Sequence, residues 1–286
     1  DKKGEKKGEN LGTQLSNLRF NPSDGMTIEF WLKKSSFEPS QTKREVLFDL
    51  WNNKTMGVTP DPTAGRFLIE LTSSDTGPFR MTYRSGSGAP ASNTIICSTQ
   101  ITSSIVASNS WNHYAVSVKS DIPNNETLVK FYVNGDLDQQ TKLTGYINEV
   151  TGALTAHIGA LQTGTVLGGG LGAGLLNASI DEFRYWKTAR TSEEIGRNWW
   201  TQVDGGSNTE TPNTTLGVYY KFNEGIVQTS AADATGFAID KKILDYSGRV
   251  SNGDWVGYPG YGYDARSTTS AMVESNVTAK EFKDPI

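Results

Sequence analysis

The stretch MTIEFWLK, residues 26–33, decides the fold class. Ile28, Phe30 and Leu32 occupy every second position in it, and a β-strand points alternate side chains to opposite faces. A surface helix would instead need apolar residues three or four positions apart. The stretch therefore predicts a half-buried strand with these three side chains in a core.

The same alternation recurs outward from this strand, in residues 66–71, 79–84, 114–118 and 129–133. Gly, Pro, Asn or Ser bounds each run, as is typical of antiparallel strands. Asn134-Gly135 follows the last run and predicts a two-residue hairpin turn, because a type I′ turn needs φ > 0 at both residues. Further strands are expected at 94–97, around Ile180 and at 216–222. The pattern predicts a β-sandwich or barrel, with these residues buried: Ile28, Phe30, Leu32, Val116, Val118, Phe131 and Phe183.

One short helix is expected near residues 191–200. Thr191 and Glu194 have the spacing of a capping box, in which the Thr hydroxyl and the Glu carboxylate each accept a backbone N–H. Ile195 and Trp199, four residues apart, give the helix an apolar face toward the sandwich.

Composition excludes several classes of protein. The 286 residues hold 27 Lys and Arg against 31 Asp and Glu, a net charge of −4, which predicts no nucleic-acid partner. No apolar run approaches the ~20 residues of a membrane span, so no membrane insertion is expected. Cys97 is the single cysteine, which excludes an intrachain disulfide and a thiolate zinc cluster.

Several motifs resemble a known family, in the right order over residues 15–200. They are 26–33, 110–116 (SWNHYAV), 131–135 (FYVNG), 156–159 (AHIG) and 179–186 (SIDEFRYW), the last followed by 189–195 (ARTSEEI). Together they resemble the laminin-G-like jelly rolls of the concanavalin A-like lectin/glucanase superfamily. The resemblance implies an all-β, two-sheet antiparallel jelly-roll sandwich. The layout, with its Asn/Thr/Ser-rich loops, is also similar to laminin-G-like domains in structural proteins of large marine tailed phages.

This organisation divides the chain into four parts. Residues 1–10 are a charged linker, 11–200 the jelly-roll domain, and 265–286 a linker or extended arm. Between them, 201–264 carries LGVYYKFNEG (216–225), which resembles a segment that precedes the first strand in many relatives. It either completes the sandwich or starts a further unit.

The strands offer no hydrolytic centre. Glucanases use clustered carboxylates, two of them about 5–5.5 Å apart in retaining enzymes, which a strand supplies with acids at i, i+2 and i+4. No strand here has such a run, and the adjacent Asp181 and Glu182 are expected to point to opposite faces. His113 and His157 lie in strand motifs and are expected to pack in the structure. The chain is therefore predicted not to be an enzyme.

Two binding sites are candidates. The aromatic residues Trp51, Tyr83 and Trp255, with Arg80 and Arg84, are expected to form a sugar-stacking surface, or else belong to core and rim. No cofactor is required. The family resemblance implies a structural Ca²⁺ at Asp181, and the alternative is a carboxylate that caps nearby backbone N–H groups.

These features predict a non-catalytic structural and binding module, displayed on a virion or other extracellular surface. Its partners would be other virion or surface proteins and glycans, which it would bind or adhere to. The alternatives are a glycan-active hydrolase or lyase on the same fold, and a bacterial adhesin domain. The polar ends and the Asp at position 1 further suggest a piece of a longer protein.

Limited proteolysis of the isolated chain checks this last expectation. Residues 273–286 should become ordered only against a partner, so cleavage after Lys280 or Lys283 should be rapid while the body resists. Equal resistance along the whole chain would contradict it.

Overall fold

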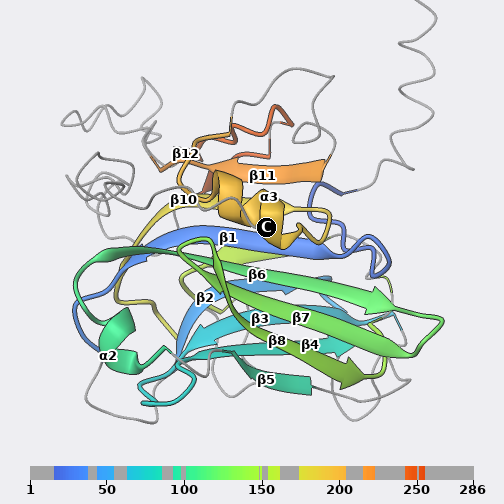
Figure 1. Ribbon diagram of the computed structural model, residues 1–286. Helices are drawn as coiled ribbons and strands as arrows, with labels where there is room; N and C mark the ends of the chain where they lie inside the picture. The colour runs from blue at the N-terminus through green and yellow to red at the C-terminus, as the bar shows by residue number, and fades with distance from the viewer. Residues whose placement is uncertain are drawn as a thin grey trace, which may run out of the picture.

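The computed structural model describes residues 16–37, 44–54, 63–85, 93–97, 101–147, 149, 154–161, 174–203, 215–222, 242–249 and 251–254. Within them, two antiparallel sheets pack face to face (Figure 1), which confirms the predicted all-β sandwich. The predictions for residues 1–10, Trp255 and 265–286 lie outside the described residues.

Six strands form one sheet and five the other. The six-stranded sheet has the order β11 (Leu216–Tyr220), β10 (Ser179–Trp186), β1 (Met26–Lys33), β6 (Trp111–Asp121), β7 (Glu126–Val133) and β8 (Asp136–Thr144). The five-stranded sheet has the order β5 (Asn93–Cys97), β4 (Phe79–Ser85), β3 (Gly65–Leu71), β2 (Glu45–Trp51) and β9 (Thr155–Ile158). A small hairpin, β12 (Lys242–Ile243) with β13 (Gly253–Asp254), follows β11 in the chain.

The core lies between the two sheets and is rich in aromatic rings. Phe48 of β2 contacts Phe183 of β10 with ring centroids 5.4 Å apart, and Phe79 of β4 contacts Phe131 of β7 at 4.9 Å. The seven side chains predicted to be buried are each at most 2% exposed, which confirms the alternation from which they were inferred.

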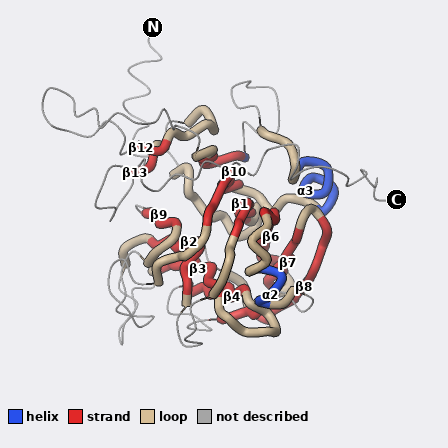
Figure 2. The backbone as a smooth tube through the Cα atoms, turned by 90° about the vertical axis from the view of Figure 1, so that its left-hand side faces the viewer, coloured by secondary structure: helices blue, strands red, loops and turns tan. Residues whose placement is uncertain are grey.

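Two short helices lie among the described residues. The predicted helix is α3 (Ser192–Asn198), and both hydrogen bonds of its capping box are present. It lies on the outer side of the six-stranded sheet, away from β2–β4 (Figure 2), and buries Ile195 completely. The second, α2 (Ser103–Val106), is a single turn capped by Thr102 that the sequence analysis did not anticipate. Neither helix is long and apolar enough to cross a membrane.

The turn between β7 and β8 is the predicted one and packs directly on α3. Asn134 and Gly135 have φ of 48° and 85°, as a type I′ turn requires. A Cβ atom at Gly135 would lie 2.2 Å from Cδ1 of Trp199, so the indole occupies the space that any other residue would need. The turn and the end of the helix therefore fit together only with glycine at this position.

A buried charge network links β1, β10 and the start of α3. Glu29 accepts a 2.5 Å hydrogen bond from Arg190, and Arg184 lies 3.6 Å from its other oxygen. Burial alone would raise the pKa of Glu29, but the two guanidiniums outweigh it and hold the pKa below its usual range. Arg184 also binds Glu182, which accepts a hydrogen bond from Tyr219. Two carboxylates and two guanidiniums thus balance one another.

His113 packs beside this network, as expected for a histidine in a strand motif. It is 1% exposed, and its ring lies 5.8 Å from that of Trp31. Burial lowers the pKa of His113 to about 3, so the ring is neutral at pH 7. A neutral imidazole leaves the charge balance of the network unchanged.

A β-bulge in β10 overturns the expected orientation of Asp181 and Glu182. Glu29 lies opposite Arg184 but Trp31 lies opposite Asp181, so two residues of β10 face the single residue Phe30. Glu182 adopts φ of 50° at this point. Both carboxylates therefore lie on the outer side of the sheet, and not on opposite faces as a regular strand would place them.

The segment after α3 joins the sandwich. β11 pairs antiparallel with β10 and forms one edge of the six-stranded sheet. Asp245 then accepts hydrogen bonds from the backbone N–H groups of Tyr219, Ser247 and Ser251. Arg249 donates to the carbonyl oxygen of Leu216. These bonds hold residues 242–254 against β11.

The cap of α3 can be tested directly. Replacing Thr191 by Ala removes the side-chain oxygen that accepts the Glu194 N–H, and should lower the free energy of unfolding by about 0.5–2 kcal/mol. Urea denaturation followed by tryptophan fluorescence measures this change. Unaltered stability would mean that the cap contributes nothing to the fold.

Candidate functional site

The outer face of the five-stranded sheet gathers charged and aromatic side chains, and we call it the arginine face. The register sets its rows across β2, β3 and β4. One row contains Trp51, Arg66 and Arg84; the next contains Asp49, Leu68 and Thr82; the third contains Val46, Glu70 and Arg80. Cross-strand neighbours in a row lie close enough for their side chains to interact.

Asp49 and Arg66 form a bidentate ion pair in the middle of this face. Nε and Nη2 of Arg66 donate to the two Asp49 oxygens at 2.7 and 2.6 Å. Both side chains are at most 2% exposed. The Trp51 ring covers the Arg66 guanidinium at 5.6 Å and donates from Nε1 to the Lys54 carbonyl oxygen. The indole is thereby held in one orientation beside a fixed positive charge.

Arg84 lies directly opposite Arg66 in the neighbouring strand. It is half-buried, and none of the described residues places a carboxylate within ion-pair distance of it. Burial and the Arg66 charge lower the pKa of Arg84, although an arginine remains protonated at neutral pH. Arg84 therefore keeps a positive charge that its described surroundings do not neutralise.

Glu70 and Arg80 occupy the third row. Glu70 is 3% exposed, and Arg44 lies 3.5 Å from its carboxylate. Burial raises the pKa of Glu70, and the charges of Arg44 and Arg80 offset this only in part. Leu161 packs against Val46 and Leu68 in the middle of the face. Trp51, Arg80 and Arg84 remain partly exposed around this covered patch.

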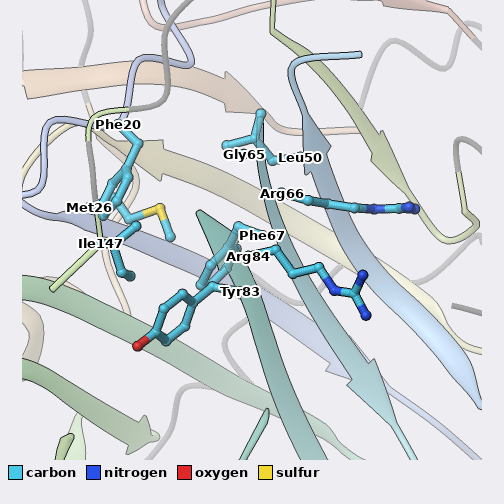
Figure 3. A pocket seen from close by; sticks show the side chains of 9 residues that line it. All are labelled: Phe20, Met26, Leu50, Gly65, Arg66, Phe67, Tyr83, Arg84 and Ile147. Atoms are coloured by element: carbon cyan, nitrogen blue, oxygen red, sulfur yellow. The ribbon is translucent and has the colours of Figure 1, made fainter. Parts of the chain in front are cut away.

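Tyr83 does not belong to this surface, which corrects the sequence prediction. It is 2% exposed and packs in the core with Phe79 and Met81, because these three alternate with Arg80, Thr82 and Arg84 along β4. Figure 3 shows Arg66 and Arg84 extending to the same side, away from Phe20 and Met26. The apolar pocket in this view measures about 10 Å³, enough for one water at most.

Three of the five residues predicted for the sugar surface thus share one face: Trp51, Arg80 and Arg84. Trp255 lies outside the described residues. Sequence reasoning missed Arg66 and Asp49, which fix the centre of the surface. The alternation in residues 66–71 already placed Arg66 outward, but nothing in the sequence showed that β2 pairs with β3 in the register that brings Asp49 to it.

Asp181 occupies a different place, at the bulge in β10. One of its carboxylate oxygens accepts the Glu182 backbone N–H at 2.9 Å, as the capping interpretation requires. The side chain is nearly buried, and the described residues contain no group of three or more His, Cys, Asp or Glu that could hold a metal ion. A calcium ion at Asp181 stays a prediction.

Comparison with protein families assigns the chain. Residues 7–196 match the model of a laminin G family described as the concanavalin A-like lectin/glucanases superfamily. This match covers most of the chain, and the protein therefore belongs to that superfamily. The class implied by the sequence motifs is confirmed. Among curated proteins, no relative matches the sequence.

Several solved structures match the chain, all at low sequence identity and low TM-score. A Bacteroides ovatus protein provisionally assigned as carbohydrate binding is 19% identical, with a TM-score of 0.46 over 84% of this chain. The chain spans 53% of that protein's length. The CBM40 of a Ruminococcus gnavus sialidase, bound to sialyllactose, is 16% identical, with a TM-score of 0.39 over 60% of this chain and 82% of its own. Laminin domains LG4-5 of the mouse α1 chain are 10% identical, with a TM-score of 0.40 over 61% and 40%.

The ion pair at the centre of the arginine face gives a stability test. Replacing Asp49 by Asn leaves the Arg66 charge buried beside Arg84 and should cost about 3–5 kcal/mol in the free energy of unfolding. Glu126→Gln is the matched control, because it breaks an exposed pair with Lys142 and should cost under about 1 kcal/mol. Equal small effects in urea denaturation would show that the buried pair does not hold the face together.

Proposed function

We propose that this chain is a non-catalytic binding module that holds glycans on the arginine face. The observation that carries the proposal is a row across β2, β3 and β4 in which Trp51 and Arg84, both partly exposed, lie on either side of the buried Arg66. A flat indole can pack against the apolar C–H side of a sugar ring, and guanidinium groups donate several hydrogen bonds in a fixed fork to its oxygens. Both kinds of group lie here on rigid neighbouring strands, which favours a site that is already formed before the ligand arrives.

The arrangement of carboxylates supports binding over hydrolysis. Both oxygens of Asp49 accept hydrogen bonds from Arg66, so this carboxylate is poorly placed to act as a nucleophile. Glu70 favours the alternative of a glycan-active hydrolase, because a raised pKa is what a general acid needs. Turnover of a bound glycan that disappears in Glu70→Gln would replace our proposal with that alternative.

We also propose that the module is displayed on a virion or other extracellular surface, beside other surface proteins. The similarity of its motifs and loops to laminin-G-like domains of phage structural proteins supports this setting. A bacterial adhesin domain would present the same face, so the arginine face serves attachment in either case. A structural calcium ion at Asp181 would act on stability and not in the binding row, since Asp181 lies in the other sheet.

Glycan-array binding of Trp51→Ala tests the proposed site. The variant should lose at least about 1 kcal/mol of binding free energy, a fivefold or greater loss of affinity, because ring stacking contributes ~0.5–1.5 kcal/mol beyond area burial. Trp200→Ala is the matched control, since Trp200 is 42% exposed and follows α3 near the opposite face. Equal losses in both variants, or no glycan binding by the parent chain, would overturn the proposal.

A further inference from the structure

The pairing of Arg66 with Arg84 is an unfavourable choice for stability alone. Like charges directly opposite each other on neighbouring strands repel and destabilise a sheet. The chain places two guanidiniums in that relation on β3 and β4, where alternation leaves both on the outer face. An arrangement that costs stability at a partly exposed surface is typical of a functional site.

Asp49 forms an ion pair with Arg66, and the described residues show none between Asp49 and Arg84. Both oxygens of Asp49 accept hydrogen bonds from Arg66, at 2.7 and 2.6 Å. The side-chain Nε of Arg84 is buried without a hydrogen-bond partner among the described residues. Arg66 and Arg84 in this row, with Asp49 in the next row, thus bring together two positive charges and one negative charge, and the excess lies at Arg84.

The third row, which contains Glu70 and Arg80, adds to this excess. Arg80 lies opposite Glu70, but the same carboxylate also faces Arg44. The described part of the face therefore carries four positive charges and two negative ones, from Arg44, Arg66, Arg80 and Arg84 and from Asp49 and Glu70. The whole chain is acidic, with a net charge of −4, so this positive surface does not follow from composition. Such a local excess attracts anions.

We infer that the arginine face selects acidic glycans, whose carboxylate or sulfate group binds the Arg84 guanidinium. The inference rests on the proposed function, because it assumes that the same face holds the sugar. The anion would supply a negative charge to Arg84, as Asp49 does to Arg66. Trp51, on the other side of Arg66, would contact the sugar ring. Neutral glycans of the same backbone would keep the Trp51 contact and hydrogen bonds to uncharged oxygens but lack this charge-assisted one.

Matched oligosaccharides test the selectivity. Isothermal titration calorimetry would compare a galacto-oligosaccharide, the corresponding oligogalacturonate and a sulfated galacto-oligosaccharide. The parent chain should bind at least one of the two acidic sugars about tenfold more tightly than the neutral one, the effect of one hydrogen bond to a charged group. The preference should shrink as NaCl is raised. The acidic sugar that binds more tightly identifies carboxylate or sulfate as the natural group.

Variants of Arg84 assign the effect to this side chain. Arg84→Gln should abolish the preference, so that the acidic and neutral sugars bind with similar affinity, and Arg84→Lys should restore part of it. The thermal midpoint of Arg84→Gln should equal or exceed that of the parent chain, because the substitution removes a like-charge opposition. Arg197→Gln is the control, since Arg197 is a half-exposed arginine on α3.

The outcomes separate this inference from the proposed function. Equal affinity for acidic and neutral sugars, with Trp51→Ala still weakening both, would overturn the acidic selectivity and leave the glycan site in place. An acidic preference that survives in Arg84→Gln would overturn the role of Arg84. Absence of binding to any of the three sugars and to a glycan array would overturn the proposed function itself.

Discussion

The buried carboxylate of Glu29 is the point on which the outer half of the structure depends. It lies on the side of β1 that faces away from the main core, where an isolated charge would be very costly. Arg190 and Arg184 make the charge tolerable, and each of them also binds a backbone carbonyl oxygen of the helical segment, Glu194 and Thr201 respectively. The compensation of one charge therefore fixes the position of α3 and the residues after it on the six-stranded sheet.

The two outer faces of the sandwich differ in whether their buried and partly buried charges are balanced by ion pairs. On the six-stranded sheet, carboxylates and guanidiniums are balanced and sealed beneath α3, with a neutral His113 beside them. On the five-stranded sheet, Asp49 forms an ion pair with Arg66, while Arg84 is partly exposed and has no ion pair among the described residues. A balanced and buried network stabilises the fold, whereas the partly exposed positive charge of Arg84 is suited to binding an anion. This contrast is why we place the ligand on the arginine face.

The sequence predicted the sandwich well because its main signal is periodic. Every segment that was predicted from alternation forms a strand. The capping box of α3 could also be recognised, because its two residues, Thr191 and Glu194, are close together in the sequence. The sequence analysis predicted no strand at β2. A bulge there lets the consecutive residues Leu47 and Phe48 both pack in the core, which interrupts the alternation. Tyr83 was considered for the sugar-stacking surface, although the alternation along β4 already placed its side chain on the core face with Phe79 and Met81.

The site was less predictable than the fold for a physical reason. Asp49 and Arg66 are 17 residues apart, and their pairing depends on strand register, which no single strand carries. The orientation of Asp181 and Glu182 likewise depends on a bulge that only the partner strand reveals. A single segment of sequence reveals its residue types and their alternation. The residues that an arginine such as Arg66 contacts belong to a neighbouring strand, so they become known only when the strand pairing is known.

The close fit of Gly135 beneath the Trp199 indole determines where this sandwich can accept foreign sequence. A peptide epitope grafted into the β7–β8 turn would displace the indole and with it the end of α3, because the turn has no space for even one methyl group. Residues 122–125, which connect β6 to β7, are all exposed. Exposed loop tips of this kind tolerate insertions best. For use as a display scaffold, the molecule therefore has one closed hairpin and one open hairpin in the same sheet.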